Sequence, residues 1–100
     1  MINKTITQAI AERKVLEFYY YGGIRVVEPF VYGIHKETKN EVLCAYQVRG
    51  FSRSKKLLRW RLYNVKNMKD IEMLDEPIAP ARPLYHQKDK RMTLIYAQVK

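Results

Sequence analysis

Cationic and aromatic side chains are concentrated in one central stretch of the sequence. From Arg49 to Arg61 the chain reads RGFSRSKKLLRWR, in which six bases are interleaved with Phe51 and Trp60. Cations can follow a phosphate backbone while aromatic faces stack on unpaired bases, and arginine can clamp a phosphate with two hydrogen bonds. This combination predicts contact with a phosphate-bearing ligand.

The net charge of the protein comes almost entirely from the same region. The chain has 100 residues and a formal net charge of +9. Residues 42–69 carry eight bases and no acid, whereas residues 1–41 carry six bases and five acids and residues 70–100 carry five of each. Such an unbalanced segment attracts anions and accelerates their association. A solvated basic face without a ligand is the alternative interpretation.

Residues 59–64 have the two-residue period of a β-strand. Arg59 and Arg61 then share one face and can point at a single ligand, while the loop before them can close over it. Trp60 shares the other face with Leu62, and we expect it to be buried in the core. The basic residues of the candidate site are Arg49, Arg53, Lys55, Lys56, Arg59 and Arg61.

The sequence carries no recognisable signature of catalysis or metal binding. It has no glycine-rich phosphate loop, no nucleophile elbow and no zinc motif. The single cysteine, Cys44, lies in an apolar run and is expected to be a buried core residue. Neither histidine lies at metal-ligand spacing from a carboxylate. We therefore predict a protein that is not an enzyme and binds no cofactor.

The periodicity predicts a mainly β protein with one N-terminal helix. The helix covers residues 3–13, and Thr5 and Asn3 compete as its N-cap. A tight turn is expected at Gly22–Gly23, and a short helical turn at residues 65–69. Strands are predicted at residues 15–21, 24–34, 41–49, 59–64 and 70–74, and residues 92–99 favour a strand over a helix.

This order of elements suggests a small β-barrel of about five strands. Pro29 cannot donate a ladder hydrogen bond, so it must lie at an edge or a bulge, and Gly33 marks a second irregularity. We assign residues 1–76 to the barrel domain. Residues 77–100 are expected to form an extended C-terminal arm that contains three of the four prolines.

No apolar run approaches the length of a transmembrane helix, and the N-terminus lacks the apolar stretch of a secretion signal. We therefore expect a cytoplasmic protein without a membrane partner.

The order of the signals resembles the WYL domain, a module with an Sm-like or SH3-like barrel found in many bacterial transcription regulators. The similarity covers about three quarters of the chain. ITQAIAERKVLEFYYY is similar to the family's opening, RVVEP to its arginine–x–valine–x–proline stretch, and LCAY to the end of the segment that names it. RWRL resembles the later aromatic–arginine–leucine stretch, and residues 71–74 the closing strand.

Two features depart from the family pattern. Glu41 and Val42 stand where the family has tryptophan and tyrosine, and only Leu43 of the naming triplet is kept. The family usually joins this domain to a DNA-binding helix-turn-helix, for which there is no room before Thr5. We therefore expect a stand-alone sensor module.

The resemblance implies ligand sensing, in which basic and aromatic residues of the barrel bind single-stranded nucleic acid or a nucleotide-like anion. Arg25, Tyr46 and Arg61 are the positions of this sequence that best match the family's ligand-binding residues. Arg25 and Tyr46 are therefore added to the candidate site. A structural ion pair of Arg25 with Glu17 or Glu28 is an equally good interpretation of that arginine. The alternative interpretation of Tyr46 is a buried residue of the core.

Two functional hypotheses follow. The first is a ligand-binding module linked to transcription regulation, which binds nucleic acid or a nucleotide-like effector and acts on a partner regulator protein. The second is a module for protein–protein interaction or oligomerisation that acts on an acidic partner. In the second case exposed strand edges accept a partner strand, or residues 92–99 join the sheet of the other subunit of a homodimer.

Overall fold

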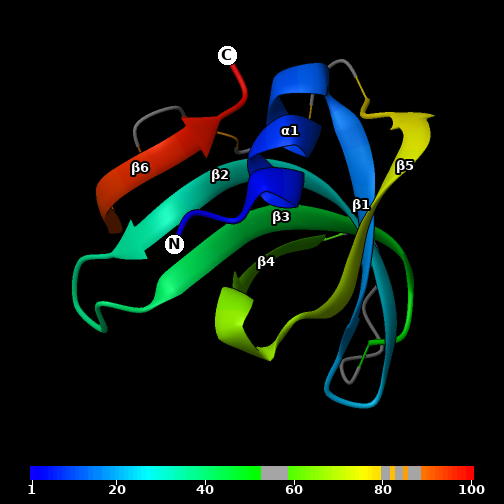
Figure 1. Cartoon of the computed structure of the whole chain (residues 1–100), viewed down its shortest axis with the longest axis horizontal. Helices are drawn as coiled ribbons and strands as arrows, with labels where there is room; N and C mark the ends of the chain where they lie inside the picture. The colour runs from blue at the N-terminus through cyan, green and yellow to red at the C-terminus, as the bar shows by residue number, and fades with distance from the viewer. Residues whose placement is uncertain (53–58, 80–81, 83–84, 86–88) are drawn as a thin grey trace.

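The computed structural model describes residues 1–52, 59–79, 82, 85 and 89–100 (Figure 1). It confirms a mainly β protein with one N-terminal α-helix, and residues 92–98 form a strand. The elements in chain order are α1 (Lys4–Glu12), β1 (Lys14–Tyr20), β2 (Gly23–His35), β3 (Glu41–Gly50), β4 (Arg59–Asn64), the 3-10 helix η1 (Val65–Asn67), β5 (Lys69–Pro77) and β6 (Met92–Gln98).

The strands form one antiparallel sheet rather than the closed barrel predicted from the sequence. Their order is β4-β3-β2-β1-β5, and β6 pairs with β2 beyond the end of β1. Within the described residues β4 and β5 are the two ends of this order and do not pair with each other. Strand number and turn positions are local properties, whereas closure depends on tilt and stagger across the whole sheet.

Helix α1 begins and ends at residues whose local geometry accounts for its length. The Asn3 side chain accepts a hydrogen bond from the backbone N–H of Ile6 at 3.0 Å, so Asn3 rather than Thr5 is the N-cap. Arg13 follows the helix in the left-handed conformation with a φ of 56°. Ile6, Ala9 and Ile10 are the buried side chains of α1, which packs against β1, β2, β5 and β6.

Strand β2 contains the bulge that Pro29 predicts. Pro29 pairs with Ala45 and Val31 pairs with Cys44, so Phe30 is an extra residue on β2. One extra residue exchanges the two faces of a strand. Consequently the side chains that face one side of the sheet have odd numbers before Phe30 and even numbers after it.

The sheet has two packed faces. The inner face is defined by Leu16, Phe18, Val27, Leu43 and Tyr63, which are fully or almost fully buried. The outer face carries Tyr46 and Trp60, which lie opposite each other on β3 and β4.

Trp60 is packed as expected, but its partners differ from those that the sequence suggested. Leu62, which shares its face, is exposed. Trp60 instead packs against Phe30 and Tyr46 and stacks on Tyr85, with 6.0 Å between the ring centroids of Trp60 and Tyr85. The ring of Trp60 is therefore part of an aromatic group on the outer face.

A buried ion pair holds the segment after β5 on this outer face. The Glu28 carboxylate accepts hydrogen bonds from Arg82 Nε at 2.6 Å, from Arg82 Nη2 at 2.9 Å and from the backbone N–H of Ala79 at 2.9 Å. The Arg82 guanidinium also lies 4.5 Å from the ring centroid of Tyr46. The described residues of this segment are thus packed on the sheet, and residues 92–98 add to the chain's own sheet as β6.

Gly33 lets β6 approach β2 closely. A Cβ atom at this position would lie 2.0 Å from the backbone oxygen of Leu94. The register of the β2–β6 pairing shifts next to Gly33, which confirms the second irregularity expected in this strand.

We predict that the Arg82→Met variant is less stable than the wild type by about 3–5 kcal/mol, because the Glu28 carboxylate stays buried without its cation. Urea unfolding followed by tryptophan fluorescence measures the loss. The matched control is the double variant Glu28→Gln with Arg82→Met, which removes both charges and should recover most of the stability. Equal stability of Arg82→Met and the wild type would contradict this role of the ion pair.

Candidate anion-binding site

Arg25 is a buried cation on the inner face near the tip of the β1–β2 hairpin. It lies opposite Phe18 on β1 and Gly50 on β3, and it is only 4% exposed. Its guanidinium carbon lies 5.4 Å from the ring centroid of Tyr20 and 5.2 Å from that of Phe51. Two aromatic rings therefore hold the cation by cation–π contacts.

No carboxylate neutralises Arg25 within the described part of the chain. The alternative ion pairs with Glu17 and Glu28 do not form, and Glu28 is bound to Arg82. Arg25 Nη2 makes one long hydrogen bond, 3.4 Å, to the backbone oxygen of Tyr21, and its buried Nε has no acceptor among the described residues. A buried guanidinium in this state has unused capacity to bind an anion.

Arg61 joins Arg25 beside a buried tyrosine. The positive charges of Arg61 and Arg25 both act on the Tyr63 hydroxyl and oppose the effect of burial, which raises the pKa of that group to about 12. Arg61 Nη2 also donates to Ser52 Oγ at 2.6 Å. Two of the predicted site residues are thus brought together from β2 and β4.

Hydrogen bonds from Tyr63 link these arginines to the end of β3. The Tyr63 hydroxyl donates to Gln47 Oε1 at 3.0 Å, and Gln47 Nε2 donates to the backbone oxygen of Phe51 at 2.8 Å. This chain of hydrogen bonds fixes the backbone of Phe51, whose ring covers Arg25. Tyr63 shares the face of Arg61 by simple alternation, but no sequence signal connected either residue with Gln47.

Glycines allow Phe51 to lie over Arg25. A Cβ atom at Gly23 would lie 2.3 Å from Phe51 Cβ, and one at Gly50 would lie 2.4 Å from the backbone oxygen of Ile24. Gly50 also has a φ of +98°, which disfavours any other residue. The glycines of the hairpin and of the β3 end are therefore required for the aromatic cover of the site.

Arg49 was predicted to belong to this site, but it lies on the outer face. Val26 pairs with Arg49 and Val27 pairs with Gln47, so Val48 is an extra residue on β3. This bulge turns Arg49 away from the face of Gln47. Arg49 instead binds both carboxylate oxygens of Glu76, at 2.9 and 2.8 Å, and this lowers the pKa of Glu76.

The remaining predicted residues are not part of the described arginine cluster. Tyr46 is buried on the outer face against Trp60, in agreement with its alternative interpretation as a core residue. The backbone of Arg59 lies opposite Gln47 on β3. The other candidate bases, Arg53, Lys55 and Lys56, lie outside the described residues.

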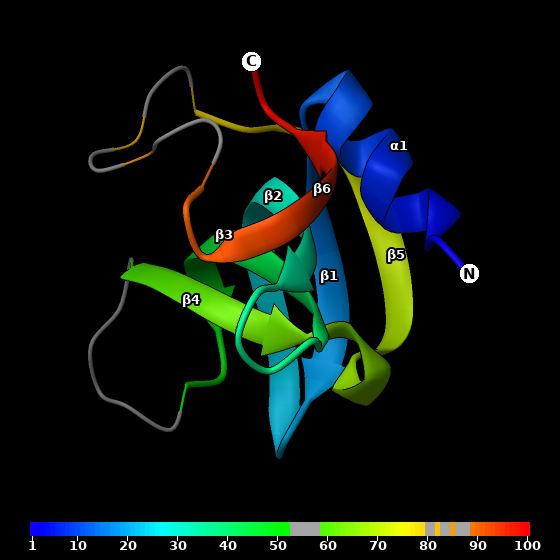
Figure 2. The ribbon, with the colours of Figure 1, turned by 90° about the vertical axis from the view of Figure 1, so that its left-hand side faces the viewer.

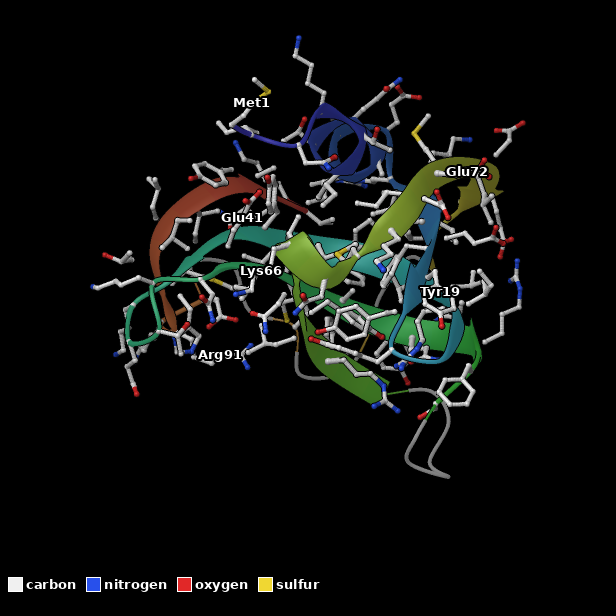
Figure 3. The ribbon with its side chains drawn as sticks, turned by 60° about the horizontal axis from the view of Figure 1, so that its bottom comes forward. Met1, Tyr19, Glu41, Lys66, Glu72 and Arg91 are labelled. Atoms are coloured by element: carbon white, nitrogen blue, oxygen red, sulfur yellow. The ribbon has the colours of Figure 1, made fainter. Side chains whose placement is uncertain are left out.

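Exposed aromatic rings gather at the same end of the molecule. Tyr21, Phe51 and Tyr19 are 50%, 41% and 39% exposed, and they are the exposed aromatic residues of the described chain. The Tyr21 ring meets the Tyr20 ring edge to face at 4.7 Å, next to Arg25. Figure 3 shows Tyr19 at this hairpin end, away from the end where Arg91 lies. Sequence analysis did not connect the hairpin tyrosines with the basic segment.

Comparison of the chain with protein-family models, with curated proteins and with solved structures finds no match. The similarity to the WYL domain therefore stays a prediction from the sequence. Among the described residues, no group of three or more potential metal ligands lies together. No helix in this described part combines the length and the apolar character needed to cross a membrane.

The raised pKa of Tyr63 predicts how stability changes at high pH. Unfolded tyrosine loses its proton near pH ~10, whereas Tyr63 in the folded protein keeps it up to about pH 12. The stabilisation is therefore complete below pH ~10 and is lost as the pH rises through the folded value.

We expect the free energy of unfolding of the wild type to fall about 2–3 kcal/mol further over this window than that of Tyr63→Phe. Urea unfolding at a series of pH values measures both proteins. Parallel curves would show that Tyr63 does not titrate differently in the folded and unfolded states.

Proposed function

We propose that this chain is a non-enzymatic binding module for an anionic ligand, single-stranded nucleic acid or a nucleotide-like effector, with a regulatory role in transcription. The observation that carries the proposal is Arg25, a buried guanidinium without a carboxylate partner among the described residues. Arg61 lies with it beside the Tyr63 hydroxyl. A phosphate bound here would supply the anion that the described residues do not provide.

The chemistry of the site suits a phosphate group. Guanidinium groups present several N–H donors in one plane and match the oxygens of a phosphate in pairs. The low dielectric around a buried cation strengthens its attraction for an anion compared with a cation in water. The net charge of +9 adds long-range attraction for the same ligands.

The aromatic rings at the hairpin end favour a ligand that carries bases. Phe51 lies directly on the Arg25 guanidinium and is itself partly exposed, and Tyr21 lies next to Tyr20. Unpaired bases stack on such rings with little sequence preference. A phosphate at Arg25 would therefore bring its neighbouring base to Phe51 or Tyr21.

The order of the elements supports, as part of this proposal, a WYL-type layout with an open sheet in place of the closed barrel. The helix that leads into the first strand and the position of β5 as the last strand before the C-terminal segment agree with the layout that the sequence resemblance implies. The site is nevertheless argued from its own residues, because fold alone does not define a function.

The test is the binding of a fluorescently labelled single-stranded oligonucleotide, measured by anisotropy. We expect Arg25→Met and Arg61→Met each to weaken binding about tenfold or more, because each removes donors at the phosphate. The matched control is Arg49→Met, which removes an equal charge from the outer face and should change the affinity only about twofold. Circular dichroism verifies that each variant is folded.

Salt dependence provides the second measurement. Raising the salt from about 50 to 200 mM should weaken binding steeply, because bound phosphates release counterions. Absence of binding at low salt would overturn the proposal. Equal affinities of Arg25→Met, Arg49→Met and the wild type would overturn the assignment of the site.

A further inference from the structure

The approach to Arg25 differs on the two sides of its guanidinium group. The guanidinium carbon lies between the Tyr20 ring, at 5.4 Å from its centroid, and the Phe51 ring, at 5.2 Å. The Tyr20 ring is packed against the core, where it meets the rings of Phe18 and Tyr63 edge to face. The Phe51 ring, in contrast, is exposed. Among the described residues, a ligand therefore reaches Arg25 from the Phe51 side.

The inner side of this approach is fixed, whereas the outer side can move. The Tyr20 hydroxyl accepts a hydrogen bond from the backbone N–H of Asn64 at 3.1 Å, which holds the Tyr20 ring in place. The Phe51 ring lies on the glycines of the hairpin, which have no side chains to confine it. A change of its rotamer uncovers Arg25 without disturbing the core. Figure 2 shows the tip of the β1–β2 hairpin, where this cover lies, at the end of the molecule away from α1.

The burial of Arg25 favours a phosphate that is attached to the rest of the ligand through one oxygen. An internal phosphate of a nucleic acid is esterified at two oxygens, and the strand continues from both of them. Both continuations would have to leave past Phe51, beside a guanidinium group that is only 4% exposed. A phosphomonoester continues in one direction and presents three acceptor oxygens to the protein. A terminal phosphate therefore fits this approach better than an internal one.

The charge of the site favours the same ligand. Arg25 has no carboxylate partner among the described residues, and Arg61 adds a second positive charge near the Tyr63 hydroxyl. A phosphomonoester carries a charge of about −1.5 to −2 at pH 7, whereas an internal phosphate of a nucleic acid carries a single negative charge. The additional charge strengthens the attraction most where water is excluded, as it is around a buried arginine.

We propose that Arg25 recognises a phosphomonoester, either the terminal phosphate of a single strand or the phosphate of a mononucleotide, and that it excludes internal phosphates. This inference rests on the proposed function and names the class of ligand that the site selects. The end of a strand, rather than its middle, would then lie at the β1–β2 hairpin. The base next to the terminal phosphate would stack on Phe51 or Tyr21.

The experiment is competition against a labelled oligonucleotide on the full chain, measured by anisotropy. The competitors share one sequence and end in a 5′-phosphate, in a 3′-phosphate or in hydroxyl groups only. A hydroxyl-ended strand that is one nucleotide longer has as many phosphates as the phosphorylated strands and is the matched control. We expect one of the phosphorylated strands to bind about tenfold more tightly than this control, or better. A mononucleotide that competes equally well supports the proposal and identifies a free nucleotide as the source of the phosphate.

Two further measurements assign the preference to Arg25. Arg25→Met should reduce it to about twofold or less, whereas Arg49→Met on the outer face should keep it. In the wild type the preference should decline as the pH falls through the second pKa of the phosphomonoester, near ~6, because the ligand then loses one of its charges.

The outcomes separate this inference from the proposed function on which it rests. Equal binding of phosphorylated and hydroxyl-ended strands, together with weaker binding by Arg25→Met, overturns the inference and leaves the proposed function standing. A preference that persists in folded Arg25→Met also overturns it. Absence of binding by every strand and by the mononucleotide overturns the proposed function itself.

Discussion

The structure depends on the way that strand β2 divides its pairing among three neighbours. One edge of β2 pairs with β3 over its length, while the other pairs first with β1 and then with β6. The bulge at Phe30 lies between these two parts and exchanges the faces of the strand. As a result a single strand contributes Val27 to the inner face before the bulge and Tyr32 to the same face after it.

The same strand separates two charged groups that lie close in sequence. Arg25 and Glu28 are three residues apart, and residues at odd spacing in a regular strand point to opposite faces. Glu28 is therefore neutralised by Arg82 on the outer face, while Arg25 is held by aromatic rings on the inner face. The sheet thus provides one arginine with a carboxylate and leaves the other without one among the described residues.

The two ends of this strand lie in different surroundings. Arg25 is near the start of β2, beside the hairpin, and β6 pairs with its last residues beside α1. The hairpin end carries the buried cation Arg25 and exposed aromatic rings, and at the other end β6 packs against α1.

Local patterns in the sequence determined most of the secondary structure. The two-residue period predicted the strands, and Pro29 predicted the bulge, because each of these acts over a few neighbouring residues. The glycine pair predicted a hairpin turn, which lies one residue earlier than expected, at Tyr21 and Gly22. The sequence also determined the excess of positive charge, which is independent of the fold.

Only the tertiary structure decided which cations lie together. Simple alternation placed Arg49 on the face of Gln47, but the bulge at Val48 turned it toward Glu76. Arg25 met Arg61 because β2 and β4 flank β3, and Trp60 met Tyr85 because a buried ion pair holds the C-terminal segment on the sheet. These outcomes rest on contacts between residues far apart in the chain, and no periodicity within one segment records them.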